Sequence, residues 1–186
     1  MMTGKVEIVN IALARLGEDS VQTLDEGTVP ANMEKMLYDS ARQAALRDYN
    51  WNFALATSSL ARLSKSVPDF RFAYALPADC LRVVRLIGGA SFVLRGNAVH
   101  TDTESPVLEY IRDVTDEAEF DSKFVEAFSY KLASDLAMSI KGSSELMASY
   151  ANVYSTLLQQ AAAESAREMS ASLSDNPYLE ARNGYR

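Results

Sequence analysis

Large apolar side chains recur at every fourth position over the stretch 120–140, and this repeat constrains the fold more than any other feature of the sequence. Such a repeat covers one face of an α-helix, and that face needs a partner surface to bury it. Gly142 is placed to end the helix, and Ser143 or Ser144 can cap a following helix that fades near Met169. The repeat consists of Phe120, Phe124, Phe128, Leu132, Leu136 and Ile140, with Val125, Ala133 and Ala137 beside it.

The first fifty residues predict two more helices. Thr3 can cap the first one, whose apolar positions follow helical spacing up to Leu16, and Gly17 is well placed to end it in a left-handed turn. A polar stretch then leads to Pro30, whose fixed φ suits a first helical turn. The second helix is expected to run from there to about Tyr49.

Between these helix pairs, residues 51–114 form short apolar runs separated by turn residues, a pattern typical of β-strands. Trp51 is expected to open the first strand. The run SFVLRGNAVHT predicts a hairpin that turns at Gly96 and Asn97. An antiparallel meander is favoured, because no connection is long enough to hold the helical crossover that parallel strands need.

The order of elements predicts an α+β fold, mainly a helical bundle of about four helices with an inserted antiparallel β-lobe. The bundle is assigned to residues 1–50 and 115–170, the β-lobe to 51–114, and a flexible C-terminal arm to 171–186. The formal net charge of −7 divides unevenly, with −3 in residues 1–50, +1 in 51–113 and −5 in 114–186. That asymmetry could orient the protein between two different neighbours, while the acidic balance argues against a broad phosphate-binding surface.

His100 is the only histidine and Cys80 the only cysteine, which leaves little material for nucleophilic or metal chemistry. A structural or exposed role is expected for His100. Cys80 lies in the run ADCLRVV, where a cysteine behaves as a small buried hydrophobic residue. One histidine and one cysteine cannot build a zinc site, and a single cysteine cannot form a disulfide within the chain. The sequence therefore predicts no catalytic residue, no cofactor and no metal.

The densest set of carboxylates is Asp113, Asp116, Glu117, Glu119 and Asp121. Asp116 and Glu119 have the spacing of a capping box at the start of the helix that carries the apolar repeat. Acidic residues in a first turn also complement the helix dipole. The alternative is that two of these carboxylates act as acid and base in a small glycan hydrolase, but capping is favoured.

No phosphate-binding loop is predicted, since Gly88 and Gly89 lack the spacing of a nucleotide-binding motif. Arg82, Arg85, Arg95 and Arg112 are interpreted as dispersed surface charges. The N-terminus does not resemble a signal peptide, and no run approaches the length of a membrane span. A protein of a reducing compartment is expected.

The strings VNIALARLGEDSVQTLDE, YDSARQAALRDYN, WNFA and ALPADCLRV occur in that order over much of the chain. This order resembles the tail tubular protein A family, the head-to-tail adaptors of short-tailed bacteriophages. The similarity is densest over residues 8–63 and 74–86 and weak in the last two helices. Its residues have structural roles as anchors, namely Gly17, Trp51, Phe53, Pro77 and Asp79. Trp51 and Phe53 are expected to alternate inward at strand spacing, and Pro77 with Asp79 to form a turn.

The resemblance implies a virion protein of the phage neck, encoded by a phage or a prophage and assembled in the bacterial cytoplasm. It implies a twelve-membered ring bound to portal protein on one side and to the tail nozzle protein on the other, with DNA passing through the lumen without specific binding. Isolated subunits could be monomers. The C-terminal helix and arm are the candidates for portal attachment, with the β-lobe facing the nozzle. The alternatives are another neck or head-completion protein, the glycan hydrolase, and a nucleic-acid-binding module.

Overall fold

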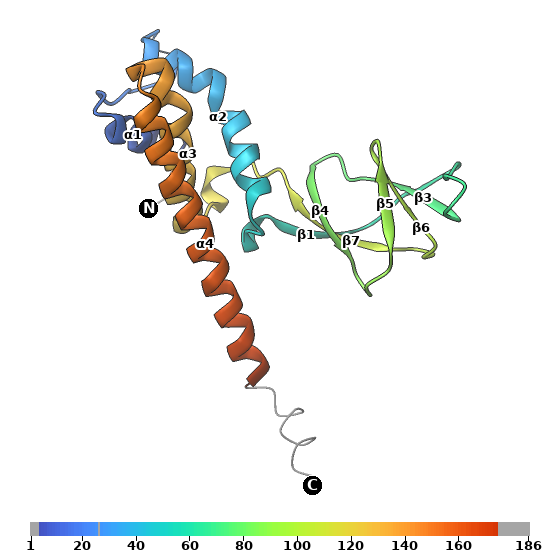
Figure 1. Cartoon of the computed structure of the whole chain (residues 1–186). Coiled ribbons are helices and arrows are strands. Elements are labelled where there is room, and N and C mark those ends of the chain that lie inside the picture. Colours follow the sequence, from blue (N-terminus) through green and yellow to red (C-terminus); the bar gives the residue numbers. More distant parts are fainter. Residues whose placement is uncertain (1–3, 26, 175–186) are drawn as a thin grey trace.

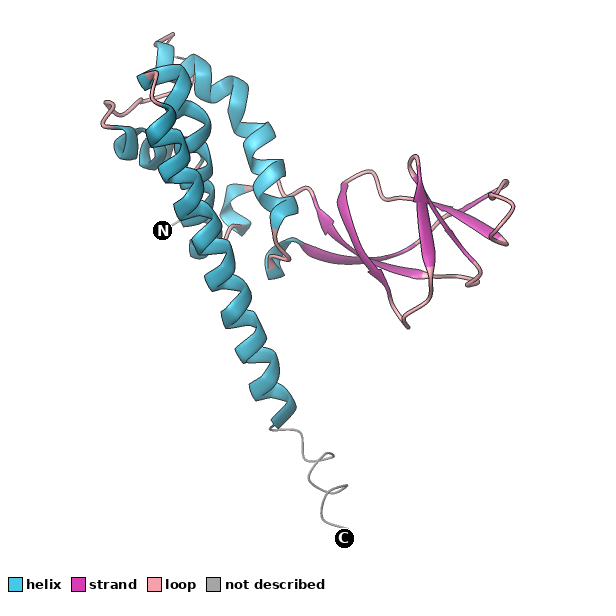
Figure 2. Cartoon of the chain, viewed as in Figure 1, coloured by secondary structure: helices cyan, strands magenta, loops and turns pink. Residues whose placement is uncertain are grey.

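The structure, a computed structural model, describes residues 4–25 and 27–174. In that part of the chain, helices and strands follow one another in the order expected for an α+β fold, with the strands between two helix pairs (Figures 1 and 2). The helices are α1 (Lys5–Leu16), α2 (Val29–Asp48), α3 (Ser122–Lys141) and α4 (Ser144–Ser174), and the 3₁₀ turns are η1 (Asn52–Ala54) and η2 (Glu117–Glu119). The strands are β1 (Leu55–Ser59), β2 (Arg62–Leu63), β3 (Phe72–Ala75), β4 (Cys80–Leu86), β5 (Phe92–Arg95), β6 (Ala98–Thr101) and β7 (Val107–Arg112).

Three of the expected helix ends are confirmed. Gly17 ends α1 and Gly142 ends α3, each in the left-handed conformation, with φ of 67° and 62°. Pro30 lies in the first turn of α2, where the Thr28 hydroxyl accepts a hydrogen bond from the Ala31 amide at 3.3 Å. Thr3, the expected cap of the first helix, lies outside the described residues, and α1 begins after Gly4 without a side-chain cap hydrogen bond from that residue.

The expected capping box at the start of α3 is wrong. Asp116 caps η2, where its carboxylate accepts a hydrogen bond from the Ala118 amide at 2.9 Å. The cap of α3 is Asp121, which accepts from the Phe124 amide at 2.6 Å. Glu119 does not close a box, because its carboxylate is paired with Arg112. Phe124 is therefore the first residue of the apolar repeat that lies in α3, whereas the sequence predicts that the repeat begins in the helix at Phe120.

Phe124, Phe128, Leu132 and Leu136 line the core face of α3 and are fully buried. They pack in one hydrophobic core against α1, α2 and α4. Helix α4 starts with Ser143 Oγ accepting a hydrogen bond from the Leu146 amide, as expected. It continues to Ser174, beyond its neighbours in Figure 1, so residues 171–174 of the expected arm are helical. Its last turns are rich in alanine and contain neither glycine nor proline, which favours the longer helix. Residues 175–186 lie outside the described residues.

The strands form two antiparallel sheets, one with the order β1-β7-β4 and one with the order β2-β3-β6-β5. The hairpin at Gly96 and Asn97 is confirmed, since Arg95 pairs with Ala98. The expected simple meander is wrong, because β1 pairs with the last strand, β7, with Leu55 opposite Ile111. The chain thus enters and leaves the β-lobe side by side, at the edge next to the helices.

The sheet β1-β7-β4 is shared between two hydrophobic cores. Leu108 and Tyr110 of β7 belong to a small core inside the β-lobe, whereas Ile111 belongs to the core of the helical bundle. Strand β4 divides in the same way, with Leu86 in the lobe core and Val84 against the bundle core. The β-lobe is therefore packed onto the bundle rather than tethered to it.

Candidate functional site

The chain passes from bundle to lobe through a cluster of aromatic rings. Trp51 is 3% exposed, and its ring lies 5.2 Å from that of Phe124 and 5.0 Å from that of Tyr49. Phe53 lies 5.2 Å from Phe124 and 5.7 Å from Phe120. The expected strand alternation of Trp51 and Phe53 is wrong. The Trp51 carbonyl accepts hydrogen bonds from two following amides, Ala54 and Leu55, and this curls the segment into η1.

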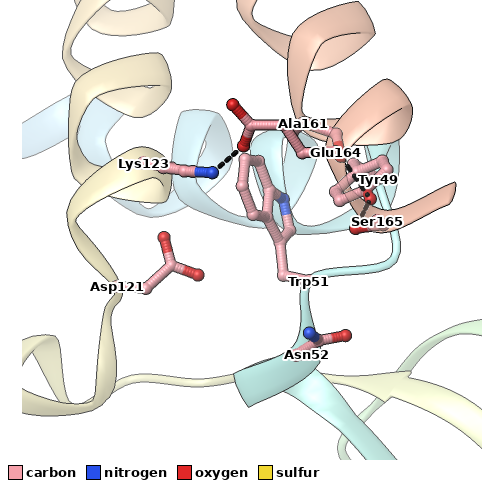
Figure 3. Close-up of a pocket in the computed structure, with 8 residues that line it drawn as sticks. All are labelled: Tyr49, Trp51, Asn52, Asp121, Lys123, Ala161, Glu164 and Ser165. Carbon is pink, nitrogen blue, oxygen red and sulfur yellow. Dashed lines mark hydrogen bonds and ion pairs between the residues drawn. The ribbon is translucent and has the colours of Figure 1, made fainter. Parts of the chain in front are cut away.

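A pocket of about 120 Å³ opens beside this cluster, where the end of α2, the start of α3 and α4 meet (Figure 3). Lys123 of α3 and Glu164 of α4 form an ion pair across it. The Tyr49 hydroxyl donates to the Ala161 carbonyl at 3.1 Å and lies 2.6 Å from Ser165 Oγ. Pockets for small molecules usually reach roughly 300 Å³ or more. Because the pocket is small and polar residues that line it are paired with one another, we interpret it as the contact region between three helices.

The acidic run is engaged in contacts within the fold. The Asp113 carboxylate accepts hydrogen bonds from the Arg42 guanidinium and, at 2.8 Å, from the side-chain amide nitrogen (Nε2) of Gln43. Glu117 accepts from the buried hydroxyl of Tyr38 at 3.2 Å. Asp116 and Asp121 are caps and Glu119 is paired with Arg112, as described above. Each of the five carboxylates therefore has a structural partner, whereas a hydrolase needs two that face a cleft.

The remaining anchor residues hold the turns that join strands and helices. Pro77 and Asp79 lie in a turn closed by a 3.1 Å hydrogen bond from the Cys80 amide to the Pro77 carbonyl. The Asp79 carboxylate accepts from the Tyr110 hydroxyl at 3.2 Å, and its carbonyl accepts from the Asp113 amide at 2.7 Å. Asp79 thus ties the start of β4 to the end of β7.

His100 and Cys80 lie in different strands and are not close partners. His100 is 6% exposed on β6, where its Nδ1 accepts a hydrogen bond from the Val67 amide at 3.4 Å and lies 3.2 Å from Ser66 Oγ. Cys80 is half-buried, and burial, followed by the charge of Asp79, raises the pKa of its thiol. A raised pKa keeps the thiol protonated and weakly nucleophilic. His100 thus contacts the hydroxyl of Ser66 and not the thiol of Cys80.

Three of the four arginines considered from the sequence lie on the paired strands β4 and β7 and contact other residues, whereas Arg95 lies on β5 of the other sheet. Arg82 contacts Asn50, Arg85 pairs with Glu109 at 2.7 Å, and Arg112 donates to the Phe53 carbonyl at 3.2 Å. The sequence predicts Arg82 and Arg85 on opposite faces of a regular strand, but β4 is irregular between residues 80 and 82 and between 83 and 85. Those irregularities break the two-residue alternation.

Within residues 4–25 and 27–174, no cluster of three or more histidine, cysteine or acidic side chains is arranged to hold a metal ion. Over the same residues, no helix combines the length and the apolar character that a membrane span requires.

Large exposed apolar side chains occur both on the helical bundle and on the β-lobe. The bundle-end group lies on the first half of α2 and on either side of the α3–α4 turn, at the end of the bundle away from the C-terminus (Figure 1). It consists of Val29, Met36, Met138 and Met147. The lobe group is spread over β2 and β5, the two edge strands of one sheet, and the residue after β4, and it consists of Leu63, Ile87, Val93 and Leu94.

A search with models of protein families found no match to this sequence, and a search of curated proteins found none either.

Proposed function

We propose that this protein is a structural adaptor of a bacteriophage neck, in which copies of the chain repeat around an axis and join portal protein to the tail nozzle protein. The observation that carries the proposal is that one subunit exposes large apolar side chains on two different parts, the helical bundle and the β-lobe. A ring built from head-to-tail contacts needs two different surfaces on each subunit, one for each neighbour.

The joint between bundle and lobe supports this assignment. A subunit that transmits force or closes a channel has to keep its two contact surfaces in a fixed relation. Here a shared sheet, the aromatic cluster around Trp51 and the pair of Arg42 with Asp113 connect the two parts. A rigid two-part subunit of this kind suits assembly, because little conformational freedom is lost when it binds.

The projecting half of α4 is the proposed attachment to the portal protein. Helix α4 continues to Ser174 and extends past the bundle in Figure 1. A helix that leaves its own bundle offers a surface to a partner without unfolding any part of the subunit. The β-lobe, on another side of the molecule, is then the surface for the nozzle protein.

The contacts of the acidic run favour the adaptor over the glycan hydrolase. The five carboxylates cap helices or hold the bundle to the lobe, and a carboxylate already paired with an arginine is a poor general acid. The proposed role requires no chemical step, only surfaces that are complementary to neighbours.

The experiment is a measurement of molar mass by light scattering on the purified chain, alone and mixed with portal protein encoded in the same genome. The proposal expects a defined ring on the portal, with twelve subunits by the family resemblance. A chain truncated after residue 160 serves to test the attachment. Full portal binding by this truncated chain would contradict the assignment of α4.

A further inference from the structure

Arginine and serine side chains surround a hollow of about 440 Å³ on the β-lobe, next to the β2–β3 loop. It is lined by Arg62, Leu63, Ser64, Ser66, Arg71 and Ala73, and no carboxylate is among these residues. That is notable in a chain with a formal net charge of −7. The segment 61–72 itself holds three cationic residues, including Lys65, and one acidic residue, Asp69.

The backbone and the rings around the hollow hold the two arginines in place. Arg62 lies on β2 with its guanidinium over the ring of Phe72, 4.4 Å from the ring centroid. Arg71 comes just before β3, and its amide donates to the Asp102 carboxylate at 2.9 Å. Neither guanidinium forms an ion pair within the described part of the chain. Both therefore keep their donors available for a ligand.

His100 fixes the loop that carries the two serines. In the sheet register it lies opposite Ala73 on one side and Val93 on the other. Its Nδ1 accepts from the Val67 amide and lies within 3.2 Å of Ser66 Oγ, so the loop is held against this face of the sheet. This arrangement requires the ring proton on Nε2. The burial of the only histidine is explained by this positioning role.

We infer that the hollow is a binding site for a phosphate group. A guanidinium presents donors in a fork that matches an oxyanion, and the Ser64 hydroxyl adds a further donor. A phosphate group carries more negative charge and more acceptor oxygens than a carboxylate, so it uses two guanidinium groups more fully. The phosphate could belong to a free phosphate compound or to the backbone of a nucleic acid. A single hollow of this kind is compatible with an acidic protein that lacks a broad basic surface.

The site is tested by titrating the full chain with sodium phosphate at constant ionic strength while recording backbone amide shifts by NMR. The expected result is a saturable change at Ser64, Ser66 and Arg71. The variant Arg62→Gln/Arg71→Gln should weaken binding about tenfold or more, since it removes two charged hydrogen-bond donors. Arg95→Gln is the matched control, because Arg95 is an exposed arginine on the other edge strand of the same sheet. It should change the affinity less than about twofold.

A second arm distinguishes the source of the phosphate. Binding of a fluorescein-labelled DNA 12-mer is followed by anisotropy, with the same variants and with inorganic phosphate as competitor. Loss of DNA binding in the double variant alone supports a backbone phosphate, and binding of phosphate without DNA supports a free compound. Equal affinity for polyglutamate, equal loss in Arg95→Gln, or no saturation with phosphate would overturn the inference. Because neither arm requires a portal protein, the result is independent of ring assembly.

Discussion

Arg42 of α2 and Asp113, the residue after β7, form a largely buried ion pair that joins the bundle to the β-lobe. The Arg42 side chain is 4% exposed and that of Asp113 is 21% exposed. The same Nη1 atom of Arg42 also donates to the Val114 carbonyl at 2.5 Å. The arginine thus satisfies a carboxylate and a backbone oxygen where the chain returns to the helices.

Removing this arginine is expected to cost far more stability than removing an exposed one. Arg42→Met leaves the Asp113 carboxylate without its charged partner, and loss of one partner of a buried pair costs about 3 kcal/mol or more. Arg85→Met is the control, because Arg85 pairs with Glu109 while its own side chain is 63% exposed. Its loss should change stability far less, because an exposed ion pair is screened by solvent. Urea unfolding of both variants measures the difference, and equal losses would contradict the role assigned to Arg42.

The aromatic cluster makes a prediction about Phe124, whose ring contacts those of Trp51, Phe53, Phe120 and Phe128. Phe124→Ala should lower the free energy of unfolding by about 3–5 kcal/mol. It should also shift the fluorescence emission of Trp51 to longer wavelength, because the indole loses its packing partner. Phe92→Ala, in the separate lobe core, is the control and should leave that emission unchanged. An unchanged spectrum in Phe124→Ala would show that the ring is not part of the tryptophan's surroundings.

Two buried tyrosines predict a loss of stability in alkali. Burial, together with the Glu117 carboxylate, raises the pKa of Tyr38 above its ordinary value of 10.0, and burial with the hydrogen bond to Asp48 does the same for Tyr154. Above pH 10 the unfolded chain releases these protons while the folded chain keeps them. Stability should therefore be intact below pH 10 and fall by about 1.4 kcal/mol per pH unit for each tyrosine above it.

The measurement is a series of urea unfolding curves from pH 8 to pH 11, in the wild type and in Tyr38→Phe/Tyr154→Phe. Comparison of the two slopes removes the contribution of other groups that titrate in this range. The double variant should lose less stability with rising pH. Parallel slopes would mean that the two hydroxyls do not carry the effect.

Replacement of Gly17 is expected to lower the stability of the protein because of the backbone conformation at this position. Its φ is 67°, and nothing lies within 4 Å of the position that a Cβ would take. Gly17→Ala is therefore expected to lower stability by about 1 kcal/mol through the left-handed conformation alone. Gly17→Asn should cost less, because asparagine tolerates that conformation better. Thermal unfolding ranks the two variants, and a larger loss for asparagine would point to crowding instead.

The two exposed apolar groups should matter for assembly and not for folding. Met36→Glu and Leu94→Glu change side chains that are 75% and 45% exposed, so each should alter stability by about 0.5 kcal/mol or less. Each should nevertheless block ring formation on the portal. Ser122→Glu, which adds the same charge at an exposed position of α3 outside both groups and outside α4, is the control. Normal rings from both apolar variants, seen by electron microscopy, would exclude these groups as contact surfaces.

The sequence predicts those parts of the fold that local chemistry decides. Gly17, Gly142 and the turn at Gly96 and Asn97 are set by backbone conformations that glycine and asparagine favour, and the structure has turns at all of them. The buried face of α3 follows from spacing alone. These features depend on neighbours in the chain, so one sequence is enough to find them.

The parts that depend on distant partners were not predictable in this way. Glu119 has the spacing of a capping box, but it pairs with Arg112 across the start of the bundle. Strand β1 finds its partner β7 about fifty residues later in the chain, and no local signal encodes that pairing. Arg62 and Arg71 are likewise brought to one hollow by a loop whose position depends on His100. The sequence signal for this hollow was an arginine on each side of one short loop.

The most direct test of the adaptor role is the molar mass of the wild-type chain by light scattering, first alone and then with the portal protein of the same genome. The account predicts a smaller species alone and, on the portal, a fixed increase in mass that corresponds to one closed ring of this chain. A mass on mixing that equals the sum of unassociated components, at concentrations where the portal protein is itself assembled, would contradict it.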